Sequence, residues 1–154
     1  MKLLVTGGLG FIGSNFILKF LDNDNNNEII NVDAEFYGSD YRNLLKIKDS
    51  ERYSFVKGNI SNKKFMEEQI SKCDAIVNFA AESHVDRSIN DANPFLVSNI
   101  RGAFTILDII TKQKKRMVQI STDEVFGSLE QGTADEQTKF NPSSPYAATK
   151  AAAE

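Results

Sequence analysis

A glycine-rich segment near the N-terminus is the first group of residues whose types and spacing could do chemistry. Gly7-Gly8-Leu9-Gly10-Phe11-Ile12-Gly13 follows a short apolar run, and Asp33 lies 20 residues beyond Gly13. Side chains in this segment would block a pyrophosphate from the backbone and from the N-terminus of the following helix, which favours anions. Asp33 is placed to accept hydrogen bonds from an adenosine ribose, and its charge favours NAD over NADP. The structural alternative is a tight turn followed by a surface aspartate.

Tyr146 and Lys150 form a second group, because a spacing of four residues puts both on one face of a helix beginning near Pro145. A phenol has an unperturbed pKa of about 10 and is a poor base at neutral pH. A neighbouring ammonium, and a positively charged nicotinamide if one is bound, favour the phenolate. The alternative is a chance pair of surface residues.

The third group is Ser121-Thr122-Asp123-Glu124, which directly follows a predicted strand. Neighbouring hydroxyl and carboxyl groups can hold a polyol and exchange protons with it. A helix cap or an acidic turn would have the same composition.

Two further segments also follow predicted strands, where open α/β sheets bind ligands: Asn59-Ile60 and Phe79-Ala80-Ala81-Glu82-Ser83. The small Ala80 and Ala81 would let the backbone lie against a cofactor. Close packing of a loop on a helix is the alternative.

Five short β-rich apolar runs are predicted to be the strands that position these groups: 3–5, 29–32, 53–56, 75–79 and 117–120. Apolar side chains recur at helical spacing over 11–21, 62–72 and 95–113, and 36–50 is a weaker helix prediction. Apolar strands of this kind cannot face water. We therefore expect an α/β fold with a doubly wound parallel sheet of the Rossmann type, covered on both faces. The three groups then converge on one edge of that sheet.

Length and composition exclude several classes of protein. The 154 residues suit one domain, and 41% hydrophobic with 25% charged residues is a globular balance. A net charge of −3 gives no electrostatic reason to expect a nucleic acid or an anionic membrane as partner. No apolar run approaches the ~20 residues of a membrane span. The single cysteine, Cys73, and single histidine, His84, argue against disulfides and a metal site. We expect a soluble, cytoplasmic protein.

The motifs resemble those of the extended short-chain dehydrogenases/reductases, and specifically the dTDP-glucose 4,6-dehydratase family. The resemblance runs along essentially the whole chain and rests on 6–14, Asp33, 80–89, 121–127 and 141–150. The glycine segment and the Tyr-x-x-x-Lys pattern occur across the superfamily. The Asp123-Glu124 pair is more discriminating, because related sugar epimerases usually carry small or hydroxyl residues there.

The resemblance implies that NAD is the cofactor and that dTDP-glucose is the expected nucleotide-sugar substrate. The residues that it implies for cofactor binding are Gly7, Gly10, Phe11, Ile12, Gly13, Asp33, Asn59, Ile60, Phe79, Ala80, Ala81, Ser83, Ser98, Tyr146 and Lys150. Asn59 departs from the family, where an aspartate usually contacts adenine. Phe126 replaces a common tyrosine.

The implied reaction is a dehydration to the 4-keto-6-deoxy sugar without net oxidation. Tyr146, assisted by Lys150, would remove the 4-hydroxyl proton while a hydride leaves C4 for NAD. Glu124 would abstract the C5 proton, protonated Asp123 would donate to the departing 6-hydroxyl, and the hydride would return to C6. Thr122 would hydrogen-bond near the 4-hydroxyl, and Ser83 would contact cofactor or substrate. For His84 we expect a positional role.

Members of the family are about twice as long as this chain. We therefore expect residues 1–154 to form the dinucleotide-binding domain without the C-terminal substrate domain. We also expect the chain to be inactive alone, its Tyr/Lys helix to be weakly held, and homodimer formation to be impaired. Two alternatives stay open: another NAD-dependent nucleotide-sugar epimerase or decarboxylase, and a bare NAD-binding module.

Overall fold

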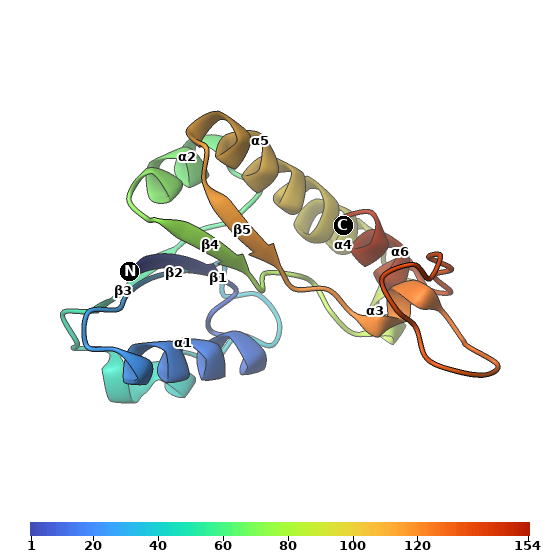
Figure 1. The fold of residues 1–154 in the computed structure, drawn as a ribbon, viewed down its shortest axis with the longest axis horizontal. Helices are drawn as coiled ribbons and strands as arrows, with labels where there is room; N and C mark the ends of the chain where they lie inside the picture. Colours follow the sequence, from blue (N-terminus) through green and yellow to red (C-terminus); the bar gives the residue numbers. More distant parts are fainter.

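The computed structural model describes residues 1–154 and contains one parallel sheet with the strand order β3-β2-β1-β4-β5 (Figure 1). The strands are β1 (Lys2–Thr6), β2 (Glu28–Asp33), β3 (Tyr53–Lys57), β4 (Ala75–Asn78) and β5 (Arg116–Gln119). The order reverses beside β1, so the topological switch point lies at the carboxyl ends of β1 and β4. The predicted doubly wound sheet is confirmed.

Helices connect the strands and extend beyond the sheet. The α-helices are α1 (Phe11–Asn23), α2 (Lys63–Ser71), α3 (Val85–Asn90), α4 (Asn93–Phe95), α5 (Ala103–Gln113) and α6 (Pro145–Ala151). Two 3-10 helices, η1 (Tyr41–Ile47) and η3 (Asp123–Phe126), and a π-helical segment, η2 (Leu96–Gly102), complete the set. The predicted helices over 11–21, 62–72 and 95–113 are confirmed. The weaker prediction over 36–50 corresponds to the shorter η1, and α3 was not predicted.

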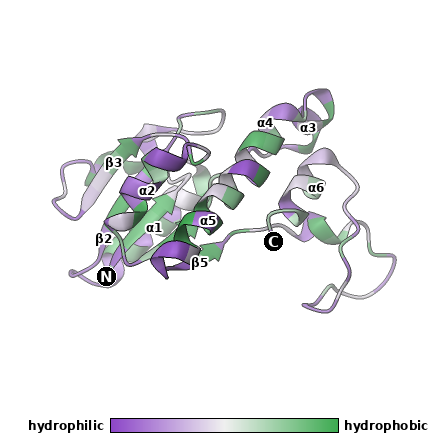
Figure 2. Cartoon of the chain, turned by 90° about the horizontal axis from the view of Figure 1, so that it is seen from above, coloured by the Kyte–Doolittle hydropathy of each residue, from purple (hydrophilic) through white to green (hydrophobic).

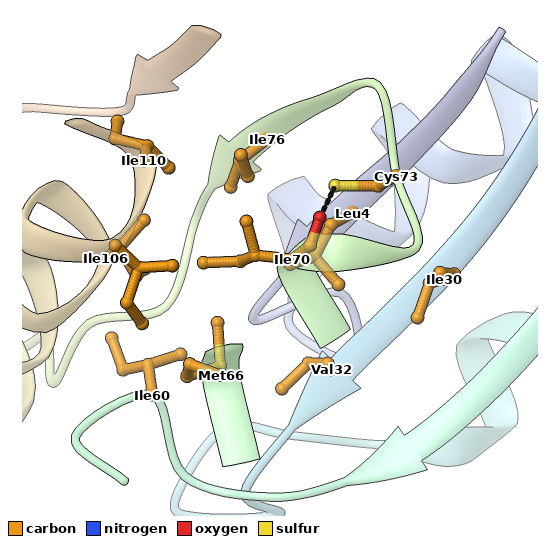
Figure 3. Packing of buried hydrophobic residues seen from close by; sticks show 11 residues of the cluster. Leu4, Ile30, Val32, Ile60, Met66, Ile70, Cys73, Ile76, Ile106 and Ile110 are labelled. Atoms are coloured by element: carbon orange, nitrogen blue, oxygen red, sulfur yellow. Dashed lines mark hydrogen bonds between the residues drawn. The ribbon is translucent and has the colours of Figure 1, made fainter. Parts of the chain in front are cut away.

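Both faces of the sheet are covered, as the apolar strands require. In Figure 1, α2 and α5 lie on one face and α1 lies on the other. Side chains from β1, β2, β4, α2 and α5 converge in the first layer (Figure 3). In that layer Met66 and Ile70 of α2 pack with Ile106 of α5, and all three are fully buried. Burial of each such side chain contributes about 1.5–3 kcal/mol to folding.

A second group of elements lies beyond the carboxyl ends of β4 and β5. It comprises α3, α4, α6 and η3, and Figures 1 and 2 both show it extending away from the sheet. Residues 127–144, between η3 and α6, contain no helix or strand. None of the helices combines the length and apolar character that a membrane span requires.

Candidate active site

The glycine segment packs against the segment that follows β4 so closely that side chains would not fit. Gly7 has a φ of 70°, and a Cβ there would lie 2.6 Å from the backbone nitrogen of Ala80. A Cβ on Gly13 would lie 2.5 Å from the carbonyl oxygen of Gly7. Backbone packing alone therefore requires these two glycines. Their absent side chains also leave the backbone accessible from the carboxyl edge of the sheet.

A cleft of about 420 Å³ opens at that edge, in front of the glycine segment. All the residues that the sequence predicts for cofactor binding line it, from Gly7 to Lys150. The sequence predictions for cofactor binding missed eleven further lining residues: Val32, Ala34, Phe36, Tyr37, Gly38, Ser39, Gly58, Glu82, His84, Ile120 and Ser121. Each of these lies in a segment at or just after the carboxyl end of a strand, and that position is the signal that could have identified them.

Asp33 ends β2 and is buried in the wall of the cleft. Its Oδ2 accepts a hydrogen bond from the Leu9 backbone nitrogen at 3.0 Å. Its Oδ1 accepts hydrogen bonds from the Glu35 backbone nitrogen and the Ser39 hydroxyl, both at 2.8 Å. A carboxylate has about four acceptor positions, so Asp33 can also accept a hydrogen bond from a ligand. The carboxylate therefore holds the glycine segment in place as well as facing the cleft.

Asn59, in the loop after β3, also lines the cleft, and its side-chain oxygen is occupied by its own loop. Its Oδ1 accepts hydrogen bonds from the backbone nitrogen and the hydroxyl of Ser61, each at 2.9 Å. Both lone pairs of that oxygen are therefore engaged within its own loop. The group of Asn59 that remains free for a ligand is therefore the amide nitrogen.

Helix α6 places Tyr146 and Lys150 at the other end of the cleft. Its first turn is capped by Ser144, whose Oγ accepts a hydrogen bond from the Ala147 backbone nitrogen at 3.0 Å. The Tyr146 backbone nitrogen donates to the Ser88 hydroxyl of α3 at 3.0 Å. The helix is present as predicted, and Ser144 and Ser88 engage its first turn; that the helix is weakly held stays a prediction.

The pKa of the Tyr146 phenol is raised, which is the opposite of the direction expected from Lys150. The main cause is burial, and the carboxylates of Glu124 and Asp123 raise it further, while the Thr122 hydroxyl lowers it. Lys150 is only 5% exposed, and its Nζ donates to the Ile120 carbonyl at 2.5 Å. Burial also lowers the pKa of this ammonium. Burial therefore dominates both shifts, and Lys150 is not among the groups that shift the pKa of the Tyr146 phenol.

The acidic group lies beside the cleft rather than inside it. Thr122 precedes η3, and its Oγ1 accepts a hydrogen bond from the Glu124 backbone nitrogen at 3.3 Å. Asp123 and Glu124 are exposed and do not line the cleft. Both nevertheless act on the Tyr146 phenol. Thr122 therefore caps η3, with the two acids in the first turn of that helix, and the charges of both acids also act on the predicted catalytic tyrosine.

Comparison with known proteins places these features in one family. The profile of the family described as GDP-mannose 4,6 dehydratase matches residues 4–154. The dTDP-glucose 4,6-dehydratase of Mycolicibacterium smegmatis is 42% identical over 157 residues, which cover 100% of this chain and 47% of that protein. The low-salt glycan biosynthesis protein Agl12 of Haloferax volcanii is 44% identical, covering 100% of this chain and 50% of that protein.

Solved structures show the same relationship. The dTDP-glucose 4,6-dehydratase DesIV from Streptomyces venezuelae, with NAD and TYD bound, has a TM-score of 0.93 and 41% identity over 99% of this chain and 49% of its own. The dTDP-glucose 4,6-dehydratase of Bacillus anthracis, in complex with NAD, has a TM-score of 0.88 and 42% identity over 99% of this chain and 48% of its own. The chain spans about half the length of the curated relatives that it matches. With its parallel sheet, its glycine-lined cleft and its Tyr146–Lys150 helix, this chain belongs to the GDP-mannose 4,6-dehydratase family.

Proposed function

We propose that residues 1–154 form the dinucleotide-binding domain of an NAD-dependent dTDP-glucose 4,6-dehydratase and carry its catalytic side chains. One observation carries the proposal: the glycine segment, Asp33 and the Tyr146–Lys150 pair line one cleft, with Asp123 and Glu124 beside Tyr146. Three of the four relatives named above are dTDP-glucose 4,6-dehydratases, and two of these are structures that hold NAD.

The residues of the cleft fit a dinucleotide. Gly10 is the N-cap of α1 and lines the cleft, and a Cβ there would meet only the Gly7 carbonyl oxygen at 3.3 Å, so no side chain covers the start of the helix at this position. Asp33 has spare acceptor capacity for ribose hydroxyls, and its charge disfavours a 2′-phosphate. The amide nitrogen of Asn59 can donate to an adenine ring nitrogen. When bound, NAD accepts a hydride from C4 of the sugar and returns it to C6.

The protein side chains move the protons. Tyr146 takes the proton of the 4-hydroxyl. Lys150 lies one helical turn further along α6, with its ammonium fixed on the Ile120 carbonyl at the edge of the cleft. Glu124 removes the C5 proton, which the 4-ketone has made acidic. Asp123 gives a proton to the departing 6-hydroxyl.

Replacement of the two acids tests the reaction class. We would give an enzyme containing this chain dTDP-glucose and NAD, and follow 4-keto sugar and 6-deoxy product separately. Asp123→Asn and Glu124→Gln should each form 4-keto sugar but little 6-deoxy product. The control is Glu130→Gln, an exposed acid outside the cleft, which should leave both products unchanged. Unaffected dehydration in both variants would refute the dehydratase assignment and favour an epimerase or decarboxylase.

Calorimetry separates the enzyme from a bare binding module. NAD should bind residues 1–154, and Asp33→Asn should weaken NAD binding relative to NADP binding, because it removes the charge that disfavours the 2′-phosphate. Binding without product formation in any context would favour the module. A chain that binds no NAD would contradict the enzyme and the module alike.

A further inference from the structure

Tyr37, His84, Arg87 and Glu82 form a cluster at the edge of the cleft that the proposed mechanism does not use. The Tyr37 ring meets the His84 ring edge-on, with centroids 5.4 Å apart and an interplanar angle of 79°. The Cζ of Arg87 lies 4.3 Å from the centroid of the Tyr37 ring. The Nη1 of Arg87 donates to the Oε2 of the buried Glu82 at 2.8 Å.

The cluster joins two segments from opposite sides of β1. Tyr37 lies in the loop after β2, whereas His84 and Arg87 belong to the segment after β4 and to α3. In the sheet, β2 and β4 are the two neighbours of β1, and both segments line the cleft. The Tyr37 contacts therefore cross the carboxyl end of β1, above the glycine segment where the pyrophosphate is proposed to bind.

The two sides of this contact are built differently. On the β4 side, Arg87 is fixed by its ion pair with buried Glu82, and His84 has a φ of 78°, an unfavourable conformation for a residue other than glycine. On the β2 side, Tyr37 is 68% exposed, and it is followed by Gly38 at a φ of 87°. A stack between an exposed ring and a guanidinium is weak. The β4 side is thus a fixed platform, and the β2 side is held by little besides this contact.

We propose that Tyr37 is a positioning residue that closes on the Arg87–His84 platform over a bound dinucleotide and slows its release. The inference rests on the proposed function and extends it. In a reaction without net oxidation the cofactor ends as it began, so the cycle needs no cofactor exchange. A closure that lengthens the residence of the dinucleotide suits such a cycle. It would hinder an enzyme that exchanges its cofactor at every turnover.

Release kinetics of the 154-residue chain test the role of Tyr37. NADH fluorescence would be followed after displacement by excess NAD in the unaltered chain and in Tyr37→Ala, Tyr37→Phe and Tyr41→Ala. Loss of the ring should speed release about fivefold, because a partly exposed cation–π stack and one edge contact are removed. Tyr37→Phe keeps both contacts and should stay within about twofold of the unaltered chain. Tyr41 is the matched control, because it is 64% exposed and does not line the cleft.

The thermal midpoint distinguishes this role from a structural one. Tyr37 is largely exposed, so Tyr37→Ala should release NADH faster at an unchanged midpoint. NADH release that is equally fast in the unaltered chain and in Tyr37→Ala would overturn the closure and leave the proposed function standing. Failure of the phenylalanine variant to restore slow release would also overturn it. If the unaltered chain binds no NADH, the proposed function fails and the closure fails with it.

Discussion

Replacing Asn99 by alanine should cost this chain about 3 kcal/mol of unfolding free energy. Asn99 is 3% exposed and lies in the π-helical segment η2. Its Nδ2 donates to the Glu82 carbonyl and to the Thr149 hydroxyl, both at 3.0 Å, and its Oδ1 accepts from the Glu82 backbone nitrogen at 2.8 Å. One side chain thus ties the cleft segment after β4 to the helix that carries Tyr146 and Lys150.

The magnitude follows from the three hydrogen bonds. Each typical hydrogen bond contributes about 1 kcal/mol net, and a buried group left without a partner costs about 1–3 kcal/mol. Asn99→Ala leaves both backbone groups of Glu82 unpaired, which gives about 3 kcal/mol even if water reaches one of them. Thr149→Val keeps the shape but removes a hydroxyl that accepts from Asn99 and donates to the Tyr146 carbonyl of its own helix, and it should cost about 1 kcal/mol. Because the pair shares one hydrogen bond, the double variant should cost about 1 kcal/mol less than the sum of the single variants.

Urea unfolding followed by far-ultraviolet circular dichroism measures these differences. Asn93→Ala is the control, because the Asn93 side chain is exposed and bonds only to Asp91; it should cost less than about 0.5 kcal/mol. Amide exchange adds a local measurement, since Asn99→Ala should speed exchange in α6 more than in α1. An Asn99→Ala variant as stable as the Asn93→Ala control would refute the reasoning. Full additivity in the double variant would refute the Asn99–Thr149 contact.

Three further outcomes follow from ionisation and burial. Lys112 and Lys63 lower the pKa of Asp108 from 3.8 to about 2. The stability that Asp108 contributes is therefore present above pH 3.8 and is lost as the pH falls toward 2. In Asp108→Asn the midpoint of urea unfolding should depend less on pH over that range. Ultraviolet titration should give the Tyr146 phenol a pKa above the ordinary value of 10.0. The corresponding titration step should be absent in Tyr146→Phe, and bound NAD should lower the pKa of that step. Buried Cys73, whose thiol pKa is raised by burial, should react with a thiol reagent no faster than the chain unfolds; rapid labelling of the folded chain would contradict its burial.

The sequence alone predicted those features of the fold and the site that depend on residues close together in the chain. Apolar runs marked all five strands to within about two residues, as for 117–120 against Arg116–Gln119. The glycine segment and Asp33 identified the carboxyl edge of the sheet because strand order and crossover handedness are strongly constrained. The hydrogen bond from the Ser61 backbone nitrogen to the Asn59 side chain forms an Asx turn, which is also a local feature. The Asn-x-Ser pattern could therefore have predicted that the Asn59 oxygen is engaged.

Other features depend on contacts between distant parts of the chain. The π-helical turn at η2 positions Asn99 to reach Glu82 and Thr149, and neither partner is visible from the periodicity of 95–113. The i, i+4 spacing placed Lys150 beside Tyr146, but it could not show that the ammonium bonds to the Ile120 carbonyl. The contact of Tyr37 with Arg87 has no sequence signal at all.

The raised pKa of Tyr146 connects the two parts of the proposed site. The phenol lines the cleft, yet its ionisation is opposed by the charges of Asp123 and Glu124, which lie outside it. Asp123→Asn removes one of those charges, so the phenol of that variant should ionise at a lower pH than the phenol of the unaltered chain. In the proposed mechanism the same side chain gives a proton to the departing hydroxyl. Replacing Asp123 should therefore change two observables together, because elimination slows while the pKa of the Tyr146 phenol falls in an ultraviolet titration. An unchanged Tyr146 titration in Asp123→Asn would contradict the coupling between the acids beside the cleft and the tyrosine inside it.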